Sequence, residues 1–293
     1  KEFKNFDKKL SLQLIKNFSF DLTNNQLSII KEIDKDLKSS YKMFRLLQGD
    51  VGSGKTIVSL IAAANVIESN YQVAIMAPTE ILAKQHFILA KKIFHSTNSN
   101  IEFLTGKSDY KDKKKIKENL INGKINLLIG THALFQKNIF FKKLGLVIID
   151  EQHKFGVKQR IELSKKGGRN CDILLMSATP IPRTLILSVY GDMDVSRLID
   201  KPTNRKKILT LSKPEEKIDE ILDFIKIKIK SKNQVFWVCP LIDESKFLDY
   251  TSAIKKYKIL SKIFIGRVGL VHGSLTKDEK NKVLDDFLEK KID

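Results

Sequence analysis

The sequence predicts an α/β fold in which helices cover both faces of a parallel sheet. Short apolar runs of strand type alternate along the chain with stretches whose apolar residues recur at helical spacing. The apolar runs are nearly continuous, which is typical of parallel strands that are buried on both faces. The expected strands are Met43–Leu47, Val73–Ala77, Leu127–Ile129, Leu146–Ile149 and Ile173–Met176.

The chain is long enough for two domains, since 293 residues correspond to two units of about 150 residues. Residues 1–21 are basic and aromatic and are expected to form an entry segment. A helical pattern from Leu22 to Ser39 opens the first domain, residues 22–199. Residues 200–293 are expected to hold a linker and part of a second α/β domain. This domain has too few expected strands to close a sheet, so it is expected to be truncated. Its expected elements are helices at Glu216–Ile229 and Lys277–Leu288 and strands at Val235–Cys239 and Val268–His272.

The charge balance favours a polyanionic partner. The formal net charge is +19, from 53 basic and 34 acidic residues, and nucleic acid is the first candidate for such an excess. A lysine-rich genome bias is the alternative cause, and the run Lys111–Lys117 is expected to be a solvated helix face. No apolar run reaches the roughly 18 residues of a membrane span, so no membrane partner is expected. Cys171 and Cys239 are expected to be reduced core thiols, because zinc would need more ligands.

Residues 49–56 match the phosphate-binding pattern G-x-x-x-x-G-K-[ST], between an expected strand and a helical stretch at Ile57–Ile67. Glycines let successive backbone N–H groups face an anion at a helix N-terminus. Lys55 is expected to reach the β- and γ-phosphates of ATP, and the Thr56 hydroxyl to bind Mg²⁺. A flexible glycine loop without a ligand is the alternative. The candidate nucleotide-binding residues here are Gly49, Asp50, Val51, Gly52, Ser53, Gly54, Lys55 and Thr56.

Two carboxylates follow the apolar run Leu146–Ile149. In P-loop enzymes an acid at the tip of a neighbouring buried strand holds Mg²⁺, which predicts that role for Asp150. Glu151 is expected to orient and polarise the attacking water. A pair of acids that caps a helix is the structural alternative. His153 follows closely and is expected to couple the nucleotide to the rest of the protein, although a lone histidine is more often structural.

A third motif, Ser177-Ala178-Thr179, follows the expected strand Ile173–Met176. Short hydroxyl side chains at a strand tip can hydrogen-bond the neighbouring acidic tip and move with it. Alone, the tripeptide would only mark the start of a loop. In series with the phosphate loop and the acid pair, it predicts a coupling element.

The order of these three motifs resembles that of superfamily 2 helicases and translocases, whose motor consists of two RecA-like lobes. The resemblance implies a RecA-like P-loop NTPase with a complete first lobe and a partial second lobe. It also implies that Gln26, at the end of Phe20–Gln26, reads the adenine edge. The strings Ala77–His86, Leu104–Lys107, Gly130–Leu134 and Val271–Leu275 resemble loops that contact nucleic acid. The DNA-contacting residues implied in this way are Pro78, Thr79, Thr105, Gly106, Gly130, Thr131, His132 and His272.

Two longer strings narrow the resemblance to the RecG family of branched-DNA helicases. Asp150–Arg160 is similar to the RecG signature, and Thr179–Leu185 is similar to a string shared by RecG and the transcription-repair coupling factor. Ser53 and Gln152 stand where the coupling factor usually has Phe and Glu. The shared string implies that Arg183 contacts DNA in a loop that couples translocation to junction movement, with a purely structural loop as the alternative.

The resemblance implies an ATP hydrolase that uses ATP and Mg²⁺ to translocate on double-stranded and branched DNA. Its expected roles are replication-fork regression and Holliday-junction branch migration in recombination and repair. It further implies a monomer in the bacterial cytoplasm, associated with the nucleoid, with single-strand-binding protein as a candidate partner. The OB-type wedge and the second-lobe arginine motif of RecG have no counterpart in this sequence. The chain alone is therefore expected to hydrolyse ATP weakly or not at all.

Three other functions fit parts of the sequence. The first is the motor of a transcription-repair coupling factor, which shares the string after Thr179. The second is a nucleic-acid-binding module with an inactive ATP site, against which the intact phosphate loop and acid pair argue. The third is a small-molecule kinase, which would need neither the third motif nor the basic surplus.

Overall fold

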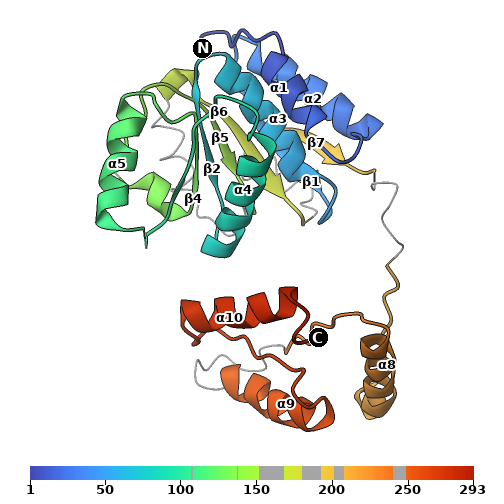
Figure 1. Ribbon diagram of the computed structural model, residues 1–293. Helices are drawn as coiled ribbons and strands as arrows, with labels where there is room; N and C mark the ends of the chain where they lie inside the picture. Colours follow the sequence, from blue (N-terminus) through green and yellow to red (C-terminus); the bar gives the residue numbers. More distant parts are fainter. Residues whose placement is uncertain (107, 137, 152–167, 180–192, 201–207, 240–248) are drawn as a thin grey trace. The chain divides into compact units, whose positions relative to one another are not determined.

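The computed structural model describes residues 1–106, 108–136, 138–151, 168–179, 193–200, 208–239 and 249–293. The chain divides into two compact units, Lys1–Lys206 and Lys207–Asp293. The first unit holds a sheet with flanking helices, and helices are the labelled elements of the second (Figure 1).

The first unit is built on a seven-stranded sheet in the order β3-β4-β2-β5-β6-β1-β7. Each neighbouring pair of strands is parallel. The predicted fold class, a parallel sheet flanked by helices, is therefore confirmed. The strands are β1 Phe44–Gly49, β2 Gln72–Met76, β3 Ile101–Leu104, β4 Leu127–Gly130, β5 Leu144–Ile149, β6 Asp172–Ser177 and β7 Asp194–Leu198.

Helices lie against both faces of this sheet (Figure 1). Successive side chains of a strand point to opposite faces, so Val73 and Ile75 of β2 join one apolar cluster and Ala74 and Met76 join the other. The helices α1 to α4 contribute to the first cluster, and α5 contributes to the second. The helices are α1 Lys9–Lys16, α2 Asn24–Leu37, α3 Lys55–Glu68, α4 Glu80–Ile93 and α5 Tyr110–Ile121, with short 3₁₀ turns η1 His132–Phe135 and η3 Gly168–Asn170.

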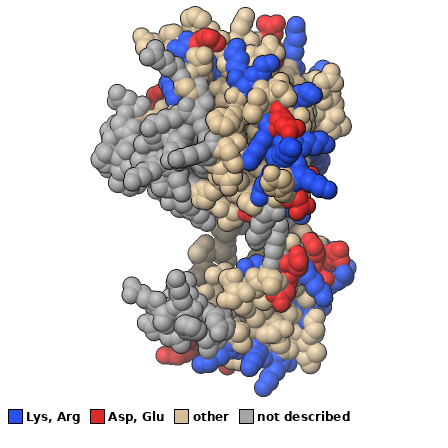
Figure 2. Space-filling view, turned by 90° about the vertical axis from the view of Figure 1, so that its left-hand side faces the viewer, with Lys and Arg blue, Asp and Glu red and all other residues tan. Residues whose placement is uncertain are grey.

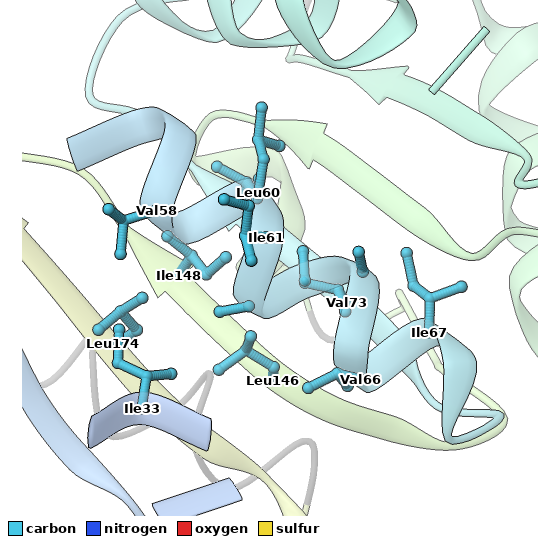
Figure 3. Packing of buried hydrophobic residues seen from close by; sticks show 14 of the residues in the cluster. Ile33, Val58, Leu60, Ile61, Val66, Ile67, Val73, Leu146, Ile148 and Leu174 are labelled. Atoms are coloured by element: carbon cyan, nitrogen blue, oxygen red, sulfur yellow. The ribbon is translucent and has the colours of Figure 1, made fainter. Parts of the chain in front are cut away.

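The helix α3 is the most deeply buried of these helices. Every residue from Ile57 to Ile67 is buried, as is typical of a helix that is apolar on all sides. Figure 3 shows Ile61 and its neighbours on α3 lying over Ile148 of β5, with Ile33 of α2 beside them. Because α3 begins at Lys55, this packing fixes the start of the helix on the sheet.

Residues 1–20 pack against the rest of the first unit. Phe6 and Leu14 are buried in the apolar cluster that contains α3. The side chain of Lys4 is buried too, and its Nζ donates to Asp172 Oδ2 at 2.5 Å and to the carbonyl of Asn170 at 3.0 Å. A buried cation requires such partners, so a specific charge pair holds this segment in addition to apolar contacts.

The second unit contains the 3₁₀ turn η4 Glu215–Lys217 and the helices α8 Ile218–Lys230, α9 Asp249–Ile263 and α10 Lys277–Leu288. The predicted strands at Val235–Cys239 and Val268–His272 are wrong, because both segments lack strand pairing. A strand needs a hydrogen-bonded neighbour. These apolar segments instead border a cavity of about 710 Å³ that they share with the three helices.

Two classes of feature are missing from the part of the chain that the structure describes. No helix there is long and apolar enough to cross a bilayer. No group of three or more His, Cys, Asp or Glu side chains gathers there in a way that could hold a metal ion. Cys171 is buried and Cys239 is half-buried, and both are free thiols.

Candidate active site

The carboxyl ends of the seven strands lie along one edge of the sheet, because every pairing is parallel. In open α/β sheets, ligands bind at this edge. A single strand, β6, separates the acid-bearing strand β5 from β1, which leads into the phosphate loop. Along the edge the predicted motifs follow one another as Thr105 after β3, Thr131 after β4, Pro78 after β2, Asp150 after β5, Ala178 after β6 and Asp50 after β1.

The phosphate loop joins β1 to α3. Gly52 and Gly54 have φ angles of 77° and 92°, in the left-handed region that glycine enters without strain. Gly54 is the N-cap of α3 and supplies no capping side chain. The first backbone N–H groups of α3 are therefore presented to the loop side, where an anion can accept their hydrogen bonds.

Gln26 lies against this loop. It belongs to a capping box at the start of α2, in which its Oε1 accepts from Thr23 N at 2.9 Å. Its Nε2 donates to the carbonyl of Ser53 at 2.8 Å, and a Cβ on Gly54 would collide with this amide. The side chain that the resemblance assigns to the adenine edge is thus bonded within the protein, where it holds α2 to the phosphate loop.

Lys55 is folded back over the loop. Its Nζ donates to the carbonyl oxygens of Gly49 at 2.6 Å and Asp50 at 3.1 Å. Burial lowers the pKa of Lys55, and the negative charges of Asp150 and Glu151 oppose this shift. The acid pair therefore lies within electrostatic reach of the lysine. A bound phosphate would add to this effect, because its negative charge would also stabilise the buried ammonium of Lys55.

Asp150 is buried, and each of its carboxylate oxygens has a partner. Oδ1 accepts from the backbone N–H of Glu151 at 3.0 Å, and Oδ2 lies 2.8 Å from Nε2 of His86 on α4. The backbone N–H of Asp150 donates to Met76 O at 2.8 Å, which ties the tip of β5 to β2. Glu151 has a φ of 48°, a left-handed conformation that is uncommon outside glycine and turns the chain sharply after β5.

The Ser-Ala-Thr motif folds back on the end of β6. Ser177 is buried, and its Oγ lies 3.0 Å from Thr179 Oγ1 and 3.2 Å from Thr179 O. Gln48 of β1 donates from Nε2 to the same Thr179 carbonyl at 3.1 Å. Ala178, between the two hydroxyl residues, is half-buried. The motif is therefore tied directly to the strand that enters the phosphate loop.

The predicted DNA-contacting loops occupy the other half of this edge. Thr79 is exposed and caps α4, its Oγ1 accepting from Leu82 N at 3.3 Å, and Pro78 beside it is half-buried. Thr105 is buried, whereas Gly106 is exposed and its carbonyl accepts from Lys113 Nζ at 2.6 Å.

The last of these loops follows β4. Gly130 is buried, and a Cβ there would strike the carbonyl oxygen of Leu104 on β3, so the close approach of the two strands requires glycine. Thr131 is half-buried and His132 is exposed at the start of η1. Thr131 and His132 thus place a hydroxyl and an imidazole, half-buried and exposed, at the carboxyl end of β4.

Three predicted residues are not brought to this edge by the described structure. His153 and Arg183 lie outside the described residues. His272 belongs to the second unit, where it is half-buried and borders the apolar cavity.

Two residues at the edge were missed by the sequence analysis. His86 interrupts the buried stripe Ala83, His86, Ala90 and Ile93 of α4, and a polar residue in an apolar stripe is a signal that could have marked it. Gln48 is likewise a buried polar residue within the apolar strand β1. Both side chains hydrogen-bond a motif that is distant in sequence.

The loop and its neighbours fit a nucleoside triphosphate with Mg²⁺. Left-handed glycines and the N-terminus of α3 form an anion-binding concavity. The Oγ of Ser53 is buried without a hydrogen-bond partner among the described residues, so a ligand can supply one. Thr56 and Asp150 offer the hard oxygen ligands that Mg²⁺ prefers.

Comparison with known proteins identifies the family. Residues 23–186 match the DEAD/DEAH box helicase family. The chain belongs to this family. Membership of the DEAD/DEAH box helicases implies the use of ATP, in agreement with the phosphate loop and the acid pair.

The predicted resemblance to RecG is also confirmed. The chain is 47% identical over 278 residues to the ATP-dependent DNA helicase RecG of Bacillus subtilis, covering 94% of this chain and 41% of that protein. It is 44% identical to RecG of Thermotoga maritima, covering 99% of this chain and 37% of the relative. The chain thus spans about two fifths of the length of these curated relatives.

Solved structures confirm the helicase fold. The structure of RecG bound to a three-way DNA junction superposes with a TM-score of 0.80 at 42% identity, covering 98% of this chain and 37% of that chain. The DEAD-box helicase Mss116 bound to ssRNA superposes with a TM-score of 0.70 at 20% identity, covering 97% of this chain and 62% of that one. The second similarity shows the fold alone, a RecA-like helicase arrangement.

Proposed function

We propose that this chain is the motor of an ATP-driven DNA translocase that acts on branched DNA. The observation that carries the proposal is the shared edge of the sheet, where the phosphate loop and the Asp150–Glu151 pair flank one strand. The opposing effects of burial and of the acid pair on the pKa of Lys55 support this placement, because charges interact strongly only when they are close.

The nucleotide would be held by the loop from Gly49 to Thr56, with Lys55 leaving the loop carbonyls to meet the β- and γ-phosphates. Thr56 and Asp150 would bind Mg²⁺, which neutralises charge on the phosphates when bound. Glu151 would orient and polarise water for in-line attack. Gln26 would set the position of the loop beside the base. The motif Ser177-Ala178-Thr179 and His153 would transmit the state of this site to the DNA-contacting loops.

DNA would lie along the other half of the edge, over the loops at Pro78–Thr79, Thr105–Gly106 and Gly130–His132. Exposed hydroxyls, backbone N–H groups and nearby lysines suit phosphates, and such contacts position a protein without reading sequence. The other proposed DNA contacts are Arg183, which lies outside the described residues, and His272, which belongs to the second unit. The order of the strands supports this division, because β2, which precedes a proposed DNA-contacting loop, is the neighbour of β5, which precedes Asp150.

Branched DNA is the proposed substrate because the RecG relative of known structure is bound to a three-way DNA junction. By analogy the activity would serve replication-fork regression and Holliday-junction migration in repair and recombination. The motor would act as a monomer on nucleoid DNA in a bacterial cytoplasm, with single-strand-binding protein as a candidate partner. The bacterial RecG relatives support this setting.

DNA-stimulated ATP hydrolysis tests the proposal, measured on a full-length protein that contains this chain. Forked duplex, linear duplex and single strands are compared for the wild type and for Lys55→Ala. We expect forked DNA to stimulate hydrolysis most and the substitution to abolish it. Hydrolysis at the same rate without DNA, or activity that survives the substitution, would contradict the proposed function.

A further inference from the structure

His86 is a buried polar residue on the inner face of α4. The residues of α4 that are buried with it, Ala83, Ala90 and Ile93, are apolar, and His86 itself is 8% exposed. Burying an imidazole costs free energy unless its nitrogens are hydrogen-bonded. Its Nε2 lies 2.8 Å from Oδ2 of Asp150. The contact joins a helix and a strand tip that are 64 positions apart in the sequence.

The contact leaves Asp150 able to bind a metal. A carboxylate offers about four lone-pair sites, and one hydrogen bond to each oxygen leaves room for a metal ion or its water. Here Glu151 N uses a site on Oδ1, and His86 uses a site on Oδ2. An ionised Asp150 only accepts, so Nε2 must carry the proton. The two donors together fix the rotation of the carboxylate.

The same helix carries a predicted DNA contact. Thr79 is the N-cap of α4, and His86 follows it by two helical turns, or about 10 Å along the axis. Met76 of β2, just before the Pro78–Thr79 loop, accepts the backbone N–H of Asp150. The segment from β2 to α4 thus contacts Asp150 through its backbone at one point and through His86 at another.

We propose that His86 is a positioning residue that orients Asp150 for Mg²⁺ and links this carboxylate to the helix that begins at the DNA-contacting loop. The proposal rests on the proposed function, because it takes Asp150 as a metal ligand. Residues that hydrogen-bond a metal ligand typically contribute about 10- to 100-fold to metal affinity or activity. A histidine that only fills space in the core would contribute nothing to the effect of Mg²⁺.

Nucleotide affinity with and without Mg²⁺ separates these two roles. The protein is titrated with ADP by calorimetry in excess Mg²⁺ and in EDTA. The variants are His86→Leu, which fills space but lacks a donor, and His86→Gln, whose amide can replace the Nε2 donor. His95→Leu is the matched control, because His95 lies just beyond α4, is exposed, and makes its one hydrogen bond among the described residues with the carbonyl of Lys92.

We expect His86→Leu to lose about tenfold or more of the increase in affinity that Mg²⁺ gives, while binding in EDTA changes less than about twofold. His86→Gln should keep most of the Mg²⁺ effect, and His95→Leu all of it. Duplex DNA should raise the Mg²⁺-dependent affinity of the wild type and of His86→Gln, but not that of His86→Leu. Thermal unfolding verifies that each variant is folded.

Two outcomes would overturn the inference. An unchanged Mg²⁺ effect in His86→Leu means that the contact does not position the metal ligand. If His86→Leu and His86→Gln lose ADP affinity equally, and do so both in Mg²⁺ and in EDTA, His86 acts through packing alone. If His86→Leu does not fold, His86→Asn, which shortens the reach of the donor, replaces it with the same expectation. A wild type whose ADP affinity ignores Mg²⁺ would instead contradict the proposed function, so the two failures are distinguishable.

Discussion

Burial changes the reactivity of single side chains in the first unit, and Cys171 is the clearest case. Burial raises the pKa of this thiol to about 12, so almost no thiolate forms at neutral pH. Cys239 is half-buried. We expect Ellman's reagent at pH 8 to titrate one thiol quickly in the native protein and two after denaturation. Cys239→Ser should remove the fast thiol, and fast labelling of Cys171 would show that the core opens readily.

Gly130 gives a second prediction at this scale. An added Cβ would meet the carbonyl oxygen of Leu104 on the paired strand β3. Gly130→Ala should therefore lower the free energy of unfolding by about 1–3 kcal/mol, the usual cost of overpacking. Gly106→Ala is the matched control, since a Cβ there meets nothing within 4 Å. Equal stability of the two variants in a urea titration would show that the strands can separate.

The roles of residues that belong to short contiguous motifs could be predicted from the sequence. The phosphate loop and the acid pair are short contiguous patterns, and the structure brings them to one edge of the sheet. The contacts of His86 and Gln48 could not be predicted from the sequence. The partner of His86, Asp150, lies 64 positions away, and the partner of Gln48, Thr179, lies 131 positions away. Pairings over such distances depend on strand order, which no local pattern specifies.

At the scale of elements, the central strands were predictable and the edge strands were not. β2, β4, β5 and β6 are buried along their whole length and read as continuous apolar runs. The edge strand β7, Asp194–Leu198, has three polar residues among its five, and two of them, Asp194 and Arg197, are exposed. Such a pattern is shared with loops. In the second unit, apolar runs predicted strands wrongly, because apolar character alone does not supply a pairing partner.

The N-terminal segment yields a prediction for an element and its anchor. Lys4→Met leaves Asp172 at the start of β6 with Lys1 as its remaining ammonium partner. Breaking a buried ion pair lowers the free energy of unfolding by about 3–5 kcal/mol when one charge is left uncompensated. Because Lys1 still pairs with Asp172, the loss should be smaller than this range. Lys9→Met is the control, because the Lys9 side chain is 83% exposed. Equal melting temperatures of Lys4→Met and Lys9→Met would mean that the Lys4–Asp172 pair contributes little to the stability of the first unit.

At the scale of the whole molecule, the net charge of +19 predicts binding to DNA that depends on salt rather than on sequence. If six to ten phosphates are contacted, affinity should fall by roughly 10³- to 10⁵-fold between 50 and 200 mM salt. Fluorescence anisotropy with two duplexes of unrelated sequence measures both properties. A shallow salt dependence, or a strong preference for one sequence, would favour contacts to base edges over contacts to phosphates.

The central claim is that a nucleoside triphosphate binds between Lys55 and Asp150. The direct measurement is the equilibrium affinity for ATP, with and without Mg²⁺, of the wild type, Lys55→Ala and Asp150→Asn. We predict that Lys55→Ala loses about tenfold or more under both conditions, since a charge-assisted hydrogen bond contributes about 1.5–3 kcal/mol. Asp150→Asn should lose only the increase that Mg²⁺ gives. Wild-type affinity in Lys55→Ala, or an intact Mg²⁺ effect in Asp150→Asn, would contradict the claim.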